Sequence, residues 1–387
     1  MRPVLRYLKG DGKIWIGLAV AAVALYLIAP ALLTPFRLSL LAKYLCWAMV
    51  AVGVGLAWGK GGMLVLGQGV FFGLGGYIMA MHLKLTDAGP GQAPDFMVLY
   101  GNGVVPAWWE PFRSPVVTLV CIVLVPAGVA ALLGVAIFRR RVKGAYFAIL
   151  SQALAAAFAI LLIGQQTTTG GTNGLNGFRG FFGYNLFDPL NKQLLFSIAV
   201  TVLLIMVVVV WHLYRSRFGE LLVAVRDQEE RVRFLGYNPA NIKLVAYVVA
   251  AAMAGIAGAL FVPIVGIISP ADVGVLPSIA FIIGVAIGGR ATLVGPVLGA
   301  IVVAYAQTTL SERFPGFWIY FQGALFMLVV AFLPGGIASI ASVVKRARAT
   351  RPEPPPAAVD LGGSSTSSDH PAPEQVEGPL GAEKARI

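Results

Sequence analysis

Apolar runs of about twenty residues recur along most of this chain, and they constrain its fold more than any other feature. Each run is long enough to cross the roughly 30 Å hydrocarbon core of a bilayer as a helix. The chain is 58% hydrophobic and only 12% charged. The sequence therefore predicts an all-α fold, that of a polytopic helical membrane protein. The clearest runs are Ile14–Leu33, Val116–Phe138, Leu194–Leu213 and Trp318–Ile340.

The same pattern predicts about ten transmembrane helices in a membrane domain over residues 14–341. Eight to ten are possible, because the eighth and ninth segments are short and interrupted by glycines. The expected spans are residues 14–34, 38–58, 63–83, 116–138, 144–164, 194–214, 242–267, 275–288, 293–310 and 318–341.

Basic residues predict the orientation, because cytoplasmic loops carry an excess of Lys and Arg. With ten crossings, residues 1–13 and three basic clusters all fall on one side, which we expect to be the cytoplasm. Residues 350–387 are rich in Pro, Ser, Gly and Ala, and we expect them to form a disordered cytoplasmic tail. The clusters are Arg139, Arg140, Arg141 and Lys143; Arg215, Arg217, Arg226, Arg231 and Arg233; and Lys345, Arg346 and Arg348.

Several function classes find no support in the residues. The formal charge is +12, but the basic residues flank apolar runs, so no nucleic-acid partner is expected. The histidines are scattered without metal-ligand spacing, so no metal or catalytic residue is predicted. Gly59–Lys60 resembles the end of a P-loop, but the first Gly and the Ser/Thr of that motif are missing. We therefore expect no cofactor in this chain, and energy from another chain or from a gradient.

The stretch AVRDQEERVRFLGYNP, Ala224–Pro239, places six charged residues between two apolar runs. Six charges at the bilayer centre would cost on the order of 15 kcal/mol, so this stretch lies outside the lipid. Its apolar residues recur at three- and four-residue spacing, which predicts an amphipathic helix. Gly236 is placed to end that helix, and Asn238–Pro239 to begin the next. The predicted apolar face consists of Phe218, Leu221, Leu222, Val225, Val232 and Leu235.

Two interpretations of this helix remain open on spacing alone, a solvated connector or a docking helix for a soluble partner. Here the sequence resembles a known family. The run EERVRFLGYNP, Glu229–Pro239, is similar to the cytoplasmic coupling loop of ABC importer permeases of the LivM branch. The resemblance implies that a loop over about 215–241 contacts an ATPase subunit, although the Glu-Ala-Ala of the wider permease motif is absent. The implied coupling residues are Phe218, Leu222, Val225, Arg226, Glu229, Glu230, Arg231 and Gly236.

Further segments carry the resemblance over roughly residues 40–340. The LivM branch serves branched-chain amino acids, amides and urea. Within it, Pro94–Phe112 and Phe261–Pro270 resemble the urea permease subunits (UrtC-like). The other matching segments are Leu66–Tyr77 (LGQGVFFGLGGY), Thr169–Phe178 (TGGTNGLNGF), Val265–Val273, Gly288–Ala300 and Phe314–Phe326.

The resemblance implies a permease subunit that translocates urea or a related small amide across a bacterial inner membrane, with both termini cytoplasmic. ATP and Mg would be bound by a partner ATPase and not by this chain. The implied partners are a second homologous permease, two cytoplasmic ABC ATPases, a periplasmic substrate-binding protein and the lipid bilayer.

Two glycine-rich segments and one polar segment are candidates for the substrate path. Glycines around Gln68 favour either close helix packing or a broken helix that lines the path. Glycines around Arg290 form a second such break, where the arginine is either a helix-end anchor or a charge in the path. The Thr/Asn-rich stretch is either an ordinary polar turn or a neutral lining for an amide. The candidate path residues are Gln68, Thr169, Thr172, Asn173 and Asn176.

Three alternatives stay open at this point. The chain could be a branched-chain amino acid permease of the same family. It could be a stand-alone carrier or channel driven by a gradient, although the scarcity of intramembrane carboxylates argues against proton coupling. An intramembrane enzyme is a third class, but no catalytic motif supports it.

Overall fold

The structure, a computed structural model, describes residues 14–142, 144–290, 292–314 and 316–332. All of them belong to one compact unit. The expected tail at residues 350–387, the expected cytoplasmic residues 1–13 and the basic cluster at Lys345–Arg348 lie outside the described residues.

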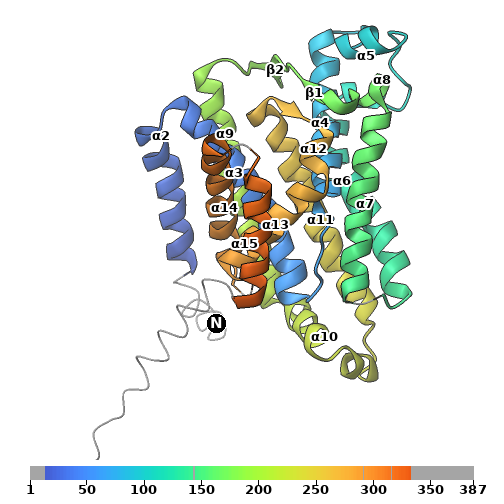
Figure 1. The fold of residues 1–387 in the computed structure, drawn as a ribbon, viewed down its shortest axis with the longest axis vertical. Helices are drawn as coiled ribbons and strands as arrows, with labels where there is room; N and C mark the ends of the chain where they lie inside the picture. The colour runs from blue at the N-terminus through green and yellow to red at the C-terminus, as the bar shows by residue number, and fades with distance from the viewer. Residues whose placement is uncertain (1–13, 143, 291, 315, 333–387) are drawn as a thin grey trace, which may run out of the picture. The chain divides into compact units, whose positions relative to one another are not determined.

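Every one of the ten expected spans contains a helix (Figure 1). The longer helices are Ile14–Leu32 (which includes η1, Ala24–Ile28, and α2, Ala29–Leu32), α3 (Pro35–Val54), α4 (Gln68–Ala88), α6 (Pro115–Arg139), α7 (Ala145–Gly164), α9 (Pro189–Arg215), α11 (Pro239–Val265), α13 (Val275–Gly288), α14 (Gly295–Arg313) and α15 (Trp318–Phe332).

Six of the described helices are long and apolar enough to cross a membrane. Together with a nearly strand-free chain, they confirm the predicted all-α polytopic class. For the other four segments, a crossing stays a prediction. The six are Ile14–Leu32, Pro35–Lys60, Pro115–Arg139, Ala145–Gly164, Pro189–Arg215 and Pro239–Val265.

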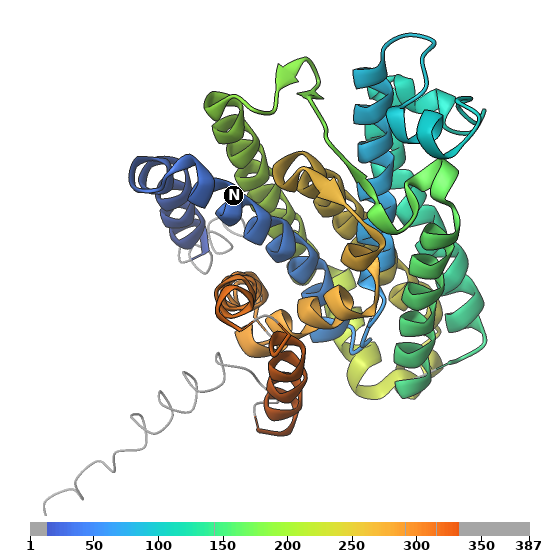
Figure 2. The same ribbon diagram turned by 45° about the horizontal axis from the view of Figure 1, so that its top comes forward.

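Helix α3 is the buried centre of the bundle. It contacts α9, α11, α13 and α14, and most of its residues are buried (Figure 2). Its last turns widen into a π-helix, η2 (Gly55–Lys60), which continues the same rod. A helix surrounded by other helices has to be apolar on all sides, which explains why its sequence shows no polar stripe.

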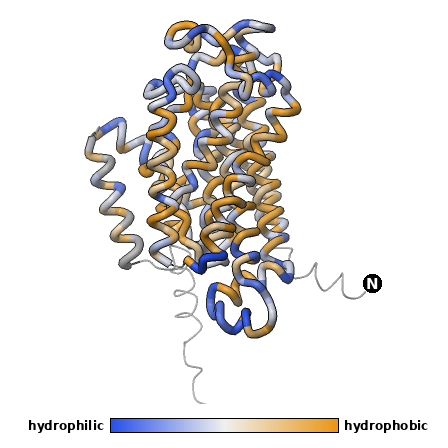
Figure 3. The backbone as a smooth tube through the Cα atoms, turned by 90° about the vertical axis from the view of Figure 1, so that its right-hand side faces the viewer, coloured by the Kyte–Doolittle hydropathy of each residue, from blue (hydrophilic) through white to orange (hydrophobic). Residues whose placement is uncertain are grey.

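Short elements connect the long helices at two opposite ends. At one end lie α5 (Asp95–Tyr100), η3 (Glu110–Arg113), α8 (Gln166–Thr169), η4 (Gly171–Asn173), α12 (Pro270–Val273) and the short strands β1 (Leu175–Asn176), β2 (Gly180–Phe181), β3 (Tyr184–Asn185) and β4 (Ile267–Ile268). Strand β1 pairs antiparallel with β4, and β2 with β3. We call this the β1 end. At the other end, the α10 end, lies α10 (Arg217–Phe234), where the hydrophilic residues gather below the apolar helices (Figure 3).

The glycines of α4 pack this helix against its neighbours. A Cβ at Gly75 would overlap the carbonyl oxygen of Gly255, and one at Gly258 would overlap that of Phe72. Helices α4 and α11 therefore touch backbone to backbone, which is how small residues stabilise helix pairs in lipid. The glycines within α4 thus agree with the packing interpretation.

The predicted start of the third span at residue 63 is wrong. Helix α4 begins at Gln68, and the residues between η2 and α4 are not helical. Gly62 has φ +67°, which only glycine adopts without strain, and Gly67 approaches the carbonyl of Ser151 too closely for a Cβ. Hydropathy alone cannot separate an apolar buried loop from a helix, so the sequence placed the boundary five residues early.

Candidate functional site

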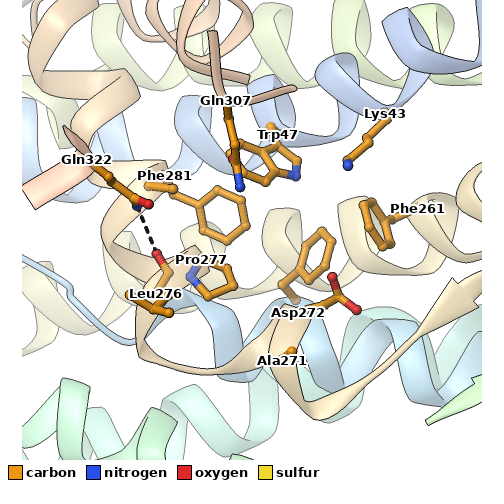
Figure 4. A pocket seen from close by; sticks show the side chains of 12 residues that line it. Lys43, Trp47, Phe261, Ala271, Asp272, Leu276, Pro277, Phe281, Gln307 and Gln322 are labelled. Atoms are coloured by element: carbon orange, nitrogen blue, oxygen red, sulfur yellow. Dashed lines mark hydrogen bonds between the residues drawn. The ribbon is translucent and has the colours of Figure 1, made fainter. Parts of the chain in front are cut away.

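A cavity of about 270 Å³, which we call the central cavity, lies among the helices of the bundle (Figure 4). Its lining comes from α3, α4, α11, α12, α13, α14 and α15, segments that are far apart in the sequence. The lining residues are Lys43, Trp47, Phe72, Phe261, Ala271, Asp272, Leu276, Pro277, Ala280, Phe281, Gln307 and Gln322.

Four polar side chains converge on this cavity from four different helices. Lys43 comes from α3, Asp272 from α12, Gln307 from α14 and Gln322 from α15 (Figure 4). The Gln322 Nε2 group donates a hydrogen bond to the Leu276 carbonyl oxygen at 3.3 Å. The Oε1 atom of Gln307 is buried and has no hydrogen-bond partner in the described part of the chain. Both charged residues are only partly buried, so they face the cavity and not the packed interior.

Asp272 is held by the local sequence Ser269–Pro270. Ser269 is the N-cap of α12, Pro270 starts the helix, and Asp272 stands at the third helical position, which together make a capping box. The Asp272 Oδ2 atom accepts hydrogen bonds from the Ser269 backbone N–H at 3.0 Å and from its hydroxyl at 2.7 Å. This fixes the carboxylate, and its Oδ1 atom is left for the cavity.

Half of the apolar residues that line the cavity are aromatic. The ring centroids of Trp47 and Phe281 are 5.2 Å apart, and those of Phe72 and Phe261 are also 5.2 Å apart. Phe72 also meets Phe281, at 5.6 Å. Contacts of this kind between aromatic rings stabilise their arrangement.

The second candidate region is helix α10. The helix was predicted as one uninterrupted element over Phe218–Leu235; it runs from Arg217 to Phe234 and is kinked at Gln228, whose φ and ψ are −148° and 74°. Its end is as predicted: Gly236 takes φ +86°, and the Gly236 and Tyr237 N–H groups donate to carbonyls of the last turn. The Asn238 side chain then caps α11.

The structure turns most of the predicted apolar face of α10 inward. Leu222, Val225 and Val232 are 0%, 2% and 4% exposed, and they contact the chain's own helices and loops. Phe218 is half-buried. The hydrophobic spacing was therefore correctly identified, but in this structure these side chains attach α10 to its own bundle, where a partner cannot touch them.

Charged residues of α10 also bind the bundle. The Arg226 Nη1 group donates to the Gly59 carbonyl oxygen of η2 at 2.9 Å. Glu229 accepts from Lys243 of α11 at 2.8 Å, and Arg233 pairs with Glu230 at 3.1 Å. Arg231, by contrast, is exposed. The predicted coupling residues thus fall into one group that holds α10 in place and another that faces outward.

An exposed apolar tip follows the kinked helix, and the sequence prediction missed most of it. Phe234, Leu235 and Tyr237 are 89%, 76% and 51% exposed. They flank Gly236, whose left-handed backbone turns the chain back toward α11. Large apolar residues beside a helix-ending glycine in a charged loop were the available signal. We call Phe234, Leu235 and Tyr237 the α10 tip.

The predicted path residues do not come together. Gln68 is fully buried, with both amide atoms unpartnered in the described part of the chain. Thr169 donates to the Leu162 and Gln165 carbonyls, so it caps the end of α7, and Thr172 is exposed at the surface. Only Asn173 and Asn176 share a cavity, of about 180 Å³ at the β1 end, with the Lys84–Asp95 ion pair.

Arg290 lies at the α10 end of the bundle, as the anchor interpretation requires. It is exposed, its guanidinium lies 5.1 Å from the ring centre of Trp58, and its backbone touches Gly59. The convergence of Lys43 and Asp272 was not visible in the sequence, because nothing in their spacing links α3 to α12.

Comparison with known proteins agrees with this architecture. Residues 36–330 match the family described as branched-chain amino acid transport system / permease component. The high-affinity branched-chain amino acid transport system permease protein LivM of Salmonella typhimurium is 26% identical over 315 residues, 75% of this chain and 67% of that protein. LivM of Escherichia coli is also 26% identical, over 313 residues and the same shares.

A second kind of relative covers less of the chain. The autoinducer 2 import system permease protein LsrC of Yersinia pestis (strain Pestoides F) is 30% identical over 157 residues, 38% of this chain and 44% of that protein. No solved structure matches the chain.

Proposed function

The chain belongs to the family of branched-chain amino acid transport system permease components, and we propose that it is the membrane-spanning subunit of an ABC importer for urea or a related small amide. In this proposal it moves its cargo across a bacterial inner membrane and uses ATP hydrolysed by a partner. The observation that carries the proposal is α10, a charged helix outside the apolar bundle that is bound to the bundle on one side and presents an apolar tip on the other.

The α10 tip is suited to contact a soluble partner. Three large apolar side chains at a charged loop end are costly in water and gain stability when a partner covers them. We infer that the partner is the ATPase, and that the α10 end faces the cytoplasm. ATP and Mg would be bound there, by the partner. The proposed complex also has a second homologous permease, a second ATPase and a periplasmic substrate-binding protein.

The preference for urea or an amide rests on two supports. The segments Pro94–Phe112 and Phe261–Pro270 resemble the urea permeases of this family. The central cavity is small, has aromatic walls and is rich in hydrogen-bonding groups, which suits a compact planar amide.

A second candidate cargo is a branched-chain amino acid. The LivM relatives carry that cargo in their names. The cavity also holds one cation and one anion, Lys43 and Asp272, which could complement the carboxylate and ammonium of a zwitterion.

Uptake in whole cells tests the proposal. Cells that lack this chain should lose saturable uptake of ¹⁴C-urea at low concentration, and the restored gene should return it. If leucine uptake falls instead and urea uptake does not, the second candidate replaces the first.

The purified chain distinguishes an ABC subunit from a stand-alone carrier. Alone it should hydrolyse no ATP, and an ATPase expressed from the same cells should co-purify with it. Uptake by the chain alone in liposomes, without ATP or partners, would contradict the proposal.

A further inference from the structure

We propose that the central cavity is the cargo-binding chamber, and that Asp272 and Lys43 recognise opposite ends of the cargo. The ligand class is a small molecule with N–H donors at one end and a carbonyl or carboxylate oxygen at the other. The inference rests on the proposed function, because it names the place and the chemistry of cargo recognition within that transporter.

The cost of the Lys43 charge supports a role in binding, because this residue lies within the candidate span Pro35–Lys60. A charge within the bilayer costs roughly 2.5–3.5 kcal/mol on insertion scales, and such residues usually face a cavity and serve function. Lys43 and Asp272 line the same cavity, yet no hydrogen bond joins them in the part of the chain that the structure describes. A bound molecule with complementary ends would place a donor at the Asp272 carboxylate and an acceptor at the Lys43 ammonium.

The cavity lining offers both hydrogen-bond acceptors and donors. Asp272 Oδ1 and Gln322 Oε1 are oxygens not used by the bonds described above, and the Lys43 ammonium and the Gln307 amide NH₂ group are donors. Urea has two NH₂ groups and one carbonyl oxygen, so it can donate to the Asp272 carboxylate and accept from the Lys43 ammonium. An α-amino acid shares the pattern through its ammonium and carboxylate.

The aromatic walls and the size of the cavity also select among possible cargo molecules. The braced rings of Phe72, Phe261 and Phe281 present apolar faces to the same space, and a planar amide group can stack on them. A volume of about 270 Å³ holds a molecule of this size together with ordered water, given about 30 Å³ per water. Solutes much larger than this volume do not fit.

The chamber is connected by backbone to the loop at the β1 end. Strand β1, in the segment of Asn173 and Asn176, pairs with β4, and Gly174 approaches the Ile268 carbonyl too closely for a Cβ. Ser269 follows directly and holds the Asp272 carboxylate. A displacement of the loop at the β1 end would therefore move β4 and Ser269, and with them the Asp272 carboxylate.

The first experiment separates cargo recognition from the structural role of Asp272. Asp272→Asn keeps the shape and removes the charge. Ser269→Ala is the matched control, because it removes the hydroxyl that caps α12 and leaves the carboxylate. Initial rates of ¹⁴C-urea and ¹⁴C-leucine uptake are measured in cells that carry the whole transporter. We expect Asp272→Asn to lower uptake of the carried solute by about 10-fold or more and Ser269→Ala by less than about 3-fold. Equal losses, or no loss from Asp272→Asn, would overturn the proposal.

The second arm identifies which cargo chemistry the chamber binds. Lys43→Gln keeps an N–H donor of similar reach but removes the charge. A neutral carbonyl keeps a hydrogen bond, so urea uptake should fall by no more than about 10-fold; a carboxylate loses its counter-charge, so leucine uptake should fall by about 100-fold. Either pattern supports the chamber, and unchanged uptake of the carried solute contradicts it.

A labelling readout keeps the chamber testable even if neither solute is the cargo. Gln307→Cys places a thiol in the cavity wall, and a small water-soluble thiol reagent should modify it in membranes. Urea, acetamide, glycine and leucine are each added at increasing concentration, and at least one should slow the labelling. If the transporter took up neither urea nor leucine, only the proposed cargo would be wrong. If the thiol were never labelled, or were protected by none of the four solutes, the proposal that the cavity binds cargo would be wrong.

Discussion

The central cavity and the α10 segment are the two places where this apolar chain gathers polar side chains, and they are assembled in opposite ways. In α10 the charged residues are contiguous and mostly satisfy one another, as in the Arg233–Glu230 and Arg226–Asp227 pairs. In the cavity they are single residues on separate helices, and within the described part of the chain no ion pair joins Lys43 to Asp272. The first arrangement tolerates water and movement, whereas the second requires that the surrounding helices hold fixed positions.

This difference predicts different responses to the same kind of mutation. Changes in the packing around the cavity should affect folding, while changes in the α10 tip should affect coupling and leave the fold intact.

The largest effect is expected from Gly258→Ala. A Cβ at this position would overlap the Phe72 carbonyl oxygen, so α11 and α4 would have to separate. We expect a destabilisation of about 3 kcal/mol or more, and poor recovery of folded protein. Gly128→Ala in α6 is the control, because no atom lies within 4 Å of its added Cβ. Thermal unfolding and the yield of monodisperse protein measure both; equal behaviour of the two variants would show that the α4–α11 contact is not tight.

The next largest effect is expected at the α10 tip. Replacing Phe234, Leu235 and Tyr237 together by Ser should lower uptake about 100-fold, because exposed apolar clusters of this kind dominate binding energy at interfaces. The melting temperature should not change, since these side chains are exposed.

Pull-down of the ATPase with the tip variant measures the loss of partner binding directly. The control changes Glu220 and Ala224, also exposed on α10, to Ser. If the control loses the ATPase as completely as the tip variant does, partner binding is spread along α10. The α10 tip would then not be the specific contact for the ATPase.

A smaller effect is expected from Arg226→Met. Its hydrogen bond to the Gly59 carbonyl links α10 to the end of η2, next to the glycine-rich loop before α4. Loss of one charge-assisted bond should raise the ATP used per solute moved by about 10-fold, with the ATPase still bound. Asp227→Asn is the control, because it removes the ion pair with Arg226 and spares the bond to Gly59. Tight coupling in Arg226→Met would rule out this bond as a mechanical link.

The smallest effect concerns Asp227 and pH. A hydrogen bond from Arg226 holds the pKa of this exposed carboxyl below its ordinary value. A group with a lowered folded-state pKa contributes stability above its unfolded pKa, near 4, and loses it as the pH falls through the folded value. The melting temperature of wild type should exceed that of Asp227→Asn by no more than about 2 °C at pH 7 and by less at pH 3. A gap that widens on acidification would contradict the sign.

Much of the architecture could be predicted from the sequence, because it depends on the free energy of moving a contiguous segment between water and lipid. A twenty-residue apolar run is excluded from water, and six neighbouring charges are excluded from lipid, whatever else the chain does. The spans, the amphipathic α10, its glycine end and the Asn238 cap of α11 all follow from such local rules. The boundary at Gln68 and the kink at Gln228 do not, because loop and helix differ there only in their tertiary contacts.

The candidate site required the tertiary structure. Local composition marked Gln68, Thr169 and Thr172 as candidate path residues, and the structure places them in the buried start of α4, beside the end of α7 and at the surface. The spacing of Leu222 and Val225 identified an apolar face but could not say whether that face meets a partner or the chain itself. The sequence by itself determined which segments are apolar helices and which connection carries the clustered charges. Only the packing of the helices decided which polar groups meet, because convergence depends on helix contacts between residues with no periodic relation along the chain.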